Sequence, residues 1–220
     1  LASYKDSPDE DIRARSYLAL ILGEMKERSA VPLLVEGLGR EEKLKSADWS
    51  QSGFLGFLRP SLDQISKDLV ESQISALWAL GSIGDNSAVP GVLEQVKNRD
   101  GSVRKVAAYV LGVLGDHRAV EALRPLLFDM KEDVRWNAAL ALAQLGDSEG
   151  ADLLMKLLDH NYADTLPDIT AEQKAELRVN AVKGLGLLKH GPAKEKILEL
   201  SKNDPVPAVR VASLEALKKY

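Results

Sequence analysis

The chain has 220 residues, 45% of them hydrophobic, and a net charge of −4 from 29 basic and 33 acidic side chains. The absence of cysteine excludes disulfides, thiolate zinc sites and cysteine nucleophiles. No apolar run approaches the roughly 20 residues that a membrane span needs, and the mixed charges lack the basic stripe of a nucleic-acid binder.

The first predicted helical hairpin lies near the start of the chain. Pro8, Asp9 and Glu10 provide the proline and the acidic first turn that are typical of a helix start. We expect this helix to run to about Lys26 and a second helix to cover about residues 30–40. Two glycines near residue 40 weaken the end of the second helix.

A first insert follows at about residues 41–69. It contains Trp49, Phe54 and Phe57, although the whole chain has only 3 Trp and 3 Phe. These rings either pack against their own repeat as a satellite core or form an aromatic protrusion that binds a partner. Both interpretations stay open, and we expect one or two short helices here.

A repeat organises the rest of the chain and is clearest over residues 88–147. Around Arg104, hydrophobic or small residues stand at offsets −1, +2, +3, +6, +7 and +10, which is one face of a helix. The pattern recurs at intervals of 58, 31, 31, 43 and 32 residues, so the basic period is 31. The six reference positions are Arg15, Gln73, Arg104, Arg135, Arg178 and Arg210. A fixed period of this length is typical of stacked helical hairpins.

Two columns of small or turn-forming residues support this interpretation. Glycine can close a helix in the left-handed conformation, and the aspartate after it can cap the next helix. This pair occurs as Gly84-Asp85, Gly115-Asp116 and Gly146-Asp147. A second column is expected to allow close contact between helices; its members are Gly23, Gly81, Gly112, Ala143 and Gly186.

A second insert lies at about residues 159–171 and is expected to be a polar loop with a helix cap at Thr170. Its possible metal ligands are Asp159, His160, Asp164 and Asp168. Their spacing fits neither a calcium-binding EF-hand loop nor a zinc motif, so we predict no metal site.

The units between residues 88 and 147 resemble the HEAT repeat family, in the bacterial-type variant also found in phycobilisome lyase subunits. That variant has the pattern AVPxLxxxLxDxDxxVRxxAAxALGxLGD, which these two units follow closely. The resemblance covers most of the chain apart from the inserts. It implies an all-α, right-handed solenoid of about six helical hairpins over residues 1–220.

An acidic or amide residue stands six positions before most of the reference arginines. The pairs are Asp9 with Arg15, Asn98 with Arg104, Asp129 with Arg135, Glu172 with Arg178, and Asp204 with Arg210. A row of arginines could bind phosphates or carboxylates. We favour a structural ladder, which HEAT repeats are known to have, because each arginine has a polar partner at constant spacing.

No catalytic constellation is evident in the sequence. The chain has no nucleophile-elbow motif, phosphate-binding loop or glycine-rich dinucleotide fingerprint. HEAT-like hydroxylases use His-Glu pairs as iron ligands, but His117, His160 and His190 are not followed by glutamate. We therefore expect no cofactor and no enzymatic activity.

We predict a non-catalytic scaffold or adaptor that binds another protein or domain. The candidate partner contacts are Trp49, Phe54, Phe57, Arg124, Phe128 and Trp136. The alternative is an enzyme-associated subunit that handles a bilin chromophore, which the resemblance to phycobilin lyase subunits implies, and nucleic-acid binding is a third possibility. A cytoplasmic location is expected, although export stays open because the chain does not begin with methionine.

Overall fold

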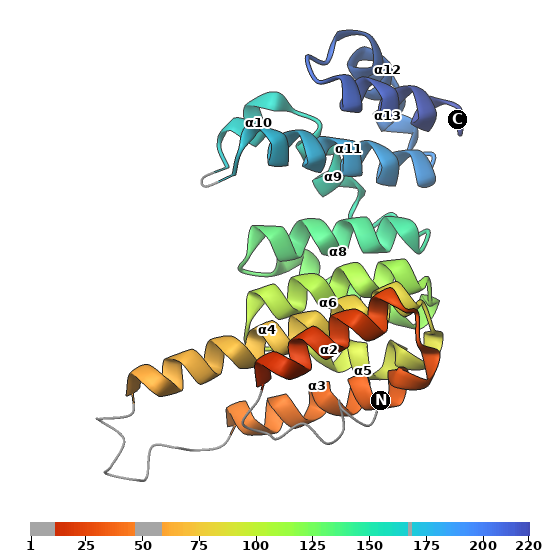
Figure 1. Ribbon diagram of the computed structural model, residues 1–220. Coiled ribbons are helices and arrows are strands. Elements are labelled where there is room, and N and C mark those ends of the chain that lie inside the picture. Colours follow the sequence, from red (N-terminus) through yellow and green to blue (C-terminus); the bar gives the residue numbers. More distant parts are fainter. Residues whose placement is uncertain (1–11, 47–58, 167–168) are drawn as a thin grey trace. The chain divides into compact units, whose positions relative to one another are not determined.

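The computed structural model describes residues 12–46, 59–166 and 169–220 (Figure 1). Every regular element in these ranges is a helix, and none of the described residues forms a strand. The predicted all-α class is confirmed. None of the helices in the described ranges is long and apolar enough to cross a membrane.

The first of two compact units ends at Asp116. Each repeat consists of two helices. The first helix of a repeat carries the reference position, such as Arg104, and the second helix packs against the first helices. The first helices are α2 (Ile12–Glu24), α4 (Arg59–Ile83) and α6 (Gly101–Leu114), and the second helices are α3 (Val31–Ser46) and α5 (Val89–Gln95). The 3₁₀ turns η1 (Arg28–Ala30) and η3 (Asn86–Ala88) precede α3 and α5.

The second unit runs from His117 to Tyr220. Its first helices are α8 (Glu132–Gln144), α11 (Ala171–Leu187) and α13 (Pro207–Leu217). The remaining elements are η4 (His117–Ala119), α7 (Val120–Leu123), η5 (Arg124–Phe128), α9 (Ala151–Leu157), α10 (His160–Asp164), η6 (Gly191–Ala193) and α12 (Lys194–Asn203). A single right-handed array over residues 1–220 stays a prediction.

Small residues bring successive first helices together within each unit, as predicted. A Cβ atom on Gly23 of α2 would lie 2.6 Å from the Cα of Ala79 in α4. A Cβ on Gly186 of α11 would lie 2.8 Å from the Cβ of Ala216 in α13. Side chains at these positions would overlap with the neighbouring helix, so the small-residue column sets the helix spacing.

The predicted helix ends are confirmed. Gly84, Gly115 and Gly146 have φ angles of 69°, 71° and 78°, which is the left-handed region. Lys26 and Lys189 take the same place in other copies, with φ of 50° and 49°. A side chain is less favourable than hydrogen in this conformation.

The caps after these glycines differ slightly from the prediction. Asp85 and Asp147 each accept a hydrogen bond, 2.9 Å long, from the backbone N–H two residues later. After Asp85 the next turn is the 3₁₀ helix η3, with the α-helix beginning at Val89. In the third copy the second helix changes from α7 to η5 around Pro125, because proline has no N–H to donate to the preceding turn.

The described part of the first insert is helical, as predicted, but its helices belong to the flanking elements. Helix α3 continues to Ser46, and α4 begins at Arg59 and places Leu69 in the core with 3% exposure. These segments contain good helix formers and, inside the helices, no proline beyond the first turn. In the second insert, which was predicted to be a loop, α10 forms a short helix and Leu166 is buried.

The predicted cap at Thr170 is confirmed. Its hydroxyl accepts a hydrogen bond of 3.3 Å from the backbone N–H of Gln173. The Gln173 side chain accepts one of 2.9 Å from the backbone N–H of Thr170, which completes a capping box and starts α11.

Candidate functional site

The arginine ladder exists, but its partner atoms differ from the prediction. Nη1 of Arg104, Arg135 and Arg210 donates, in each case at 2.7 Å, to the backbone carbonyl oxygen six residues earlier. These carbonyls belong to Asn98, Asp129 and Asp204. The spacing predicted from the sequence therefore reflects a contact between side chain and backbone.

The side chains of these three acidic or amide residues have another role. Each accepts a hydrogen bond from the backbone N–H two residues later, at 2.9 Å for Asn98 and Asp129 and 2.8 Å for Asp204. This bond shapes the turn between two repeats. The turn then presents its carbonyl to the arginine, so the ladder is a structural feature and not a row of free cations.

The predicted pair of Glu172 and Arg178 stays a prediction, and each of the two residues has another contact. Hydrogen bonds with its own backbone N–H and with Thr170 lower the pKa of the Glu172 carboxyl at the start of α11. Arg178 Nε lies 3.5 Å from Oδ2 of Asp204. In the remaining pair, Arg15 is buried, with 3% exposure, and Asp9 lies outside the described residues.

Asp204 is the centre of a buried polar cluster in the second unit. Its side chain has no solvent exposure, and its Oδ2 lies 3.1 Å from His160 Nε2 as well as near Arg178. The cluster joins α10 and α11 to the turn before α13. His160 therefore contributes a contact to this cluster, and the described part of the chain contains no group of three possible metal ligands.

Arg124, predicted to contact a partner, is already surrounded by acidic groups of its own chain. Its Nη1 lies 2.8 Å from Glu121, its Nη2 2.7 Å from Asp147, and its Nε 2.7 Å from Glu149. The hydrogen bond to Asp147 raises the pKa of Arg124. The guanidinium connects η5 to the turn after α8, and the predicted contact of Arg124 with a partner stays a prediction.

Phe128 and Trp136, two of the predicted partner contacts, have opposite environments. Phe128 is 83% exposed, next to Met130 at 95%. Trp136 is only 5% exposed and packs in the hydrophobic core of the second unit with Leu154 and Leu185. Trp136 therefore presents no surface to a partner, because α8 turns its ring inward. Trp49, Phe54 and Phe57 lie outside the described residues.

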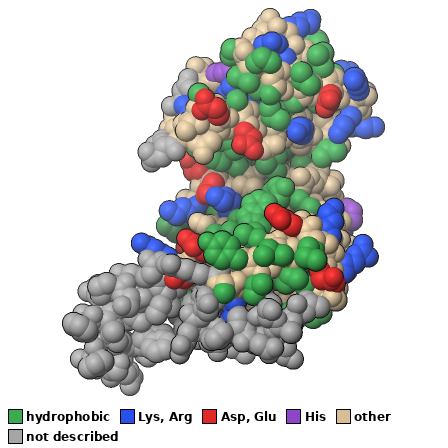
Figure 2. All heavy atoms as spheres, in the orientation of Figure 1, with side chains coloured by type: hydrophobic (Ala, Val, Ile, Leu, Met, Phe, Trp, Pro, Cys, Tyr) green, Lys and Arg blue, Asp and Glu red, His purple; other side chains and the backbone are tan. Residues whose placement is uncertain are grey.

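A surface that the sequence analysis missed lies on the first unit. Leu20, Trp78 and Tyr109 are 41%, 42% and 40% exposed and occupy the same position, five residues after the reference position, in α2, α4 and α6. Val113 is one turn further along α6 and is 44% exposed. We call these four residues the apolar stripe. Figure 2 shows hydrophobic side chains gathered over these helices.

The stripe is ordered by an aromatic contact between two repeats. The ring centroids of Trp78 and Tyr109 are 5.0 Å apart and the planes are tilted by 53°. Tilted rings at this distance attract one another beyond simple burial. The sequence contains an indication of this stripe, because the same position of the repeat is apolar in the first four copies, the fourth being Leu140. In the last two copies it is occupied by Lys183 and Glu215.

The comparisons with known proteins agree with this architecture. The sequence profile described as HEAT repeats matches residues 60–129 and 89–167. The chain carries HEAT repeats. No curated protein sequence matches it significantly.

Two solved structures resemble this HEAT-repeat chain. One is the complex of CpcE and CpcF of phycocyanin lyase from Nostoc sp. PCC7120, with 20% identity, a TM-score of 0.50, and coverage of 98% of this chain and 85% of that chain. The other is an engineered protein with 19% identity, a TM-score of 0.52, and coverage of 98% and 94%. At these identities the likeness shows the fold alone.

Proposed function

We propose that this HEAT-repeat chain is a non-catalytic scaffold that binds another protein through the apolar stripe of its first unit. The observation that carries the proposal is the exposure of Leu20, Trp78 and Tyr109 in one column of three successive helices. Aromatic residues are enriched at protein interfaces, and tryptophan and tyrosine are frequent hot spots.

The geometry of the stripe supports recognition of a protein surface. Trp78 and Tyr109 lose little conformational entropy on binding because each ring already contacts the other. The two residues are still 42% and 40% exposed. A partner that covers both rings would remove apolar surface from water without first ordering the site.

The polar clusters support a non-catalytic role. His160 and Arg124, which could act as a base or an anion ligand, are held by carboxylates of their own chain. The ladder arginines Arg104, Arg135 and Arg210 donate to backbone carbonyls. These groups stabilise turns between repeats. A cytoplasmic location is part of the same proposal.

The test is quantitative affinity capture with a double variant, Trp78→Gln with Tyr109→Gln. Leu198→Gln is the matched control, since Leu198 has a similar exposure of 44% but lies in α12 of the second unit. Loss of a hot spot typically costs 2 kcal/mol or more, so we expect retention of specific partners to fall about 30-fold in the double variant only. Equal retention by the double variant and the control would contradict the proposal.

The aromatic insert is tested separately. Because α3 extends to Ser46 and α4 begins at Arg59, the change is best confined to Trp49, Phe54 and Phe57, each replaced by serine. If the insert binds a partner, this triple variant loses that partner while its thermal stability stays near that of the unmodified chain. If the rings form a satellite core, the thermal stability of the triple variant falls below that of the unmodified chain.

The alternative function is that of a subunit that handles a bilin chromophore. The observation in its favour is the fold likeness to the complex of CpcE and CpcF of phycocyanin lyase. Chromophore binding is expected to shift the absorption spectrum of added bilin. The absence of a shift at micromolar protein concentration would exclude this alternative and leave the scaffold proposal intact.

A further inference from the structure

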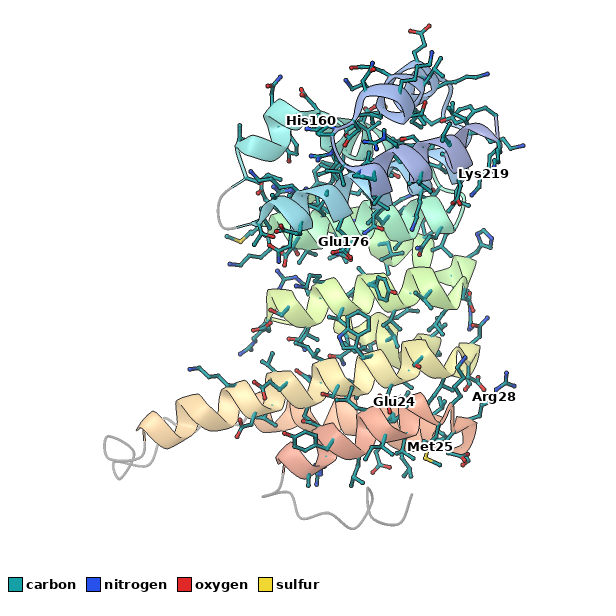
Figure 3. All side chains as sticks on the ribbon, turned by 45° about the horizontal axis from the view of Figure 1, so that its top comes forward. Glu24, Met25, Arg28, His160, Glu176 and Lys219 are labelled. Atoms are coloured by element: carbon teal, nitrogen blue, oxygen red, sulfur yellow. The ribbon has the colours of Figure 1, made fainter. Side chains whose placement is uncertain are left out.

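The three methionines of the chain differ in their exposure, and they carry its only sulfur atoms because it has no cysteine. Met130 lies in the turn between η5 and α8 and is 95% exposed. Met25 lies beside Glu24 and Arg28 at the end of α2 and is 69% exposed (Figure 3). Met155 lies on α9 and packs, partly buried, against the core of the second unit. Reagents in the solvent therefore reach the sulfur of Met130 most easily.

The turn that carries Met130 does not need hydrophobic side chains. Phe128, two residues earlier, is also exposed, and we call Phe128 and Met130 the exposed pair. Two other turns have the same contact between an arginine and the backbone carbonyl oxygens of the turn. Neither has a large hydrophobic side chain at these two positions, which are occupied by Lys97 and Arg99 and by Asn203 and Pro205. The exposed pair is therefore not required by the fold of the turn.

The backbone around Met130 is held by contacts that do not involve its side chain. The backbone N–H of Asp129 donates to the carbonyl oxygen of Leu126 at 3.1 Å. Oδ1 of Asp129 accepts a hydrogen bond of 2.9 Å from the backbone N–H of Lys131. Nη1 of Arg135 donates to the carbonyl oxygens of Asp129 and Met130, at 2.7 Å and 3.4 Å. A chemical change at the Met130 sulfur leaves all of these contacts in place.

We infer that Met130 is a site of reversible oxidation, where sulfoxide formation makes the exposed pair more polar without unfolding the chain. The oxidant is a peroxide, which transfers one oxygen atom to the sulfur. The O–O bond breaks, an S–O bond forms, and the peroxide is reduced to water or an alcohol. A sulfoxide reductase restores the thioether with an external dithiol, which becomes a disulfide while the oxygen leaves as water.

Oxidation at this position changes what the exposed pair can bind. Phenylalanine and methionine are enriched at protein interfaces, and the flexible thioether adapts to irregular apolar surfaces. The sulfoxide is polar, so it weakens apolar contacts of the pair. This regulation is independent of the apolar stripe, because the stripe belongs to the first unit and contains no methionine.

The order of oxidation is tested on the folded full chain with hydrogen peroxide. Mass spectrometry of peptides from successive time points gives a separate oxidation rate for each methionine. We expect Met130 to react first and Met25 second, and Met155 to react about tenfold more slowly than Met130, because the peroxide must reach the sulfur. A rate at Met130 that does not exceed the rates at both other methionines would overturn the inference.

The effect on the surface is tested in a Met25→Leu background, which leaves Met130 as the exposed methionine. Oxidation is expected to reduce retention on a phenyl column, and reductases for both sulfoxide epimers with a dithiol are expected to restore it.

Met130→Leu in the same background is the matched control, since leucine keeps a hydrophobic side chain without sulfur, and its retention should stay constant. The thermal midpoint measured by circular dichroism should not change on oxidation. An equal loss of retention in the control would overturn the inference. A fall of the midpoint on oxidation that Met130→Leu prevents would also overturn it, because Met130 would then be a structural residue.

Discussion

Asp147 Oδ2 accepts a hydrogen bond of 2.7 Å from Arg124 Nη2, and this contact connects η5 to the turn after α8. The two residues are 23 positions apart in the chain. Asp147 also accepts a hydrogen bond from the backbone N–H of Glu149 through its other carboxylate oxygen. One carboxylate therefore both shapes a turn and holds the preceding second helix in place.

The Arg124–Asp147 contact predicts a pH-dependent loss of stability. Burial alone would raise the pKa of Asp147, but the Glu149 N–H and the Arg124 guanidinium outweigh it and hold the pKa below its ordinary value of 3.8. Since the folded chain binds this proton less tightly than the unfolded chain, protonation favours unfolding. The stabilisation is complete above about pH 4 and is lost as the pH falls through the lowered pKa.

Asp147→Asn tests this contact. The neutral amide keeps an oxygen for the Glu149 N–H but loses the ion pair, so the free energy of unfolding is expected to fall by about 1 kcal/mol at pH 7, after allowance for solvent screening. The difference from the unmodified chain should shrink towards pH 3, as measured by urea unfolding. Glu121→Gln, at the exposed side of the same guanidinium, is the control and should change little. A difference that is constant with pH would contradict the assignment.

Lys189 offers a stabilising substitution. It has a φ of 49° in the position where other copies have glycine, and its side chain is exposed. Lys189→Gly removes the steric conflict of a left-handed backbone, although glycine adds entropy to the unfolded chain. We expect a net gain of about 0.5–1 kcal/mol, seen as a higher thermal midpoint.

Lys183→Gly is the matched control for that gain. Lys183 is also exposed but lies within α11, where glycine is expected to cost about 1 kcal/mol. The two lysine-to-glycine changes should therefore shift the midpoint in opposite directions. A loss of stability in both variants would show that the conformation of Lys189 carries no strain.

The sequence predicted the repeat but not every contact within it. Period and column composition depend on which residues must face a neighbouring repeat, so the helix face at Arg104, the turn at Gly115 and the small residue at Gly23 followed from the pattern. The spacing between Arg210 and Asp204 was also visible. A spacing does not reveal which atoms meet, however, so the carbonyl acceptor could not be predicted from the sequence.

The candidate site was predicted less well for a related reason. Trp136 and Trp78 are both large rings in first helices, yet one is 5% exposed and the other 42%. Which side of a helix is covered depends on packing in space, and the presence of a single aromatic residue does not determine it. A position that is apolar in several repeats but is not among the predicted core positions, as at Trp78 and Tyr109, was the better indicator of an exposed binding surface.

Replacing glycine by alanine is expected to destabilise the chain within the small-residue column and to stabilise it outside that column. Gly23→Ala places a Cβ 2.6 Å from the Cα of Ala79, so α2 and α4 must move apart at a cost of about 1–3 kcal/mol. Gly39→Ala in α3 meets no atom within 4 Å and should stabilise by about 0.5–1 kcal/mol, because alanine favours helix. Thermal unfolding of both variants checks the pair. A gain in stability for Gly23→Ala would show that the two helices are not closely packed.

The buried cluster at Asp204 gives the largest expected effect. Asp204→Asn keeps an oxygen for the Val206 N–H but leaves the buried Arg178 without its carboxylate. Removing one partner of a buried ion pair typically costs 3–5 kcal/mol, and the long Nε–Oδ2 distance of 3.5 Å suggests about 2–3 kcal/mol here.

Urea unfolding at pH 7 measures this cost, with Asp159→Asn as control. Asp159 also accepts a backbone hydrogen bond two residues later, from Asn161, but it is exposed and has the smaller effect of a turn residue. His160→Ala in the Asp204→Asn background should cost less than His160→Ala alone, since the histidine contact at 3.1 Å depends on the same carboxylate. Additive losses would mean that His160 and Asp204 act independently, and the cluster would not be a single unit.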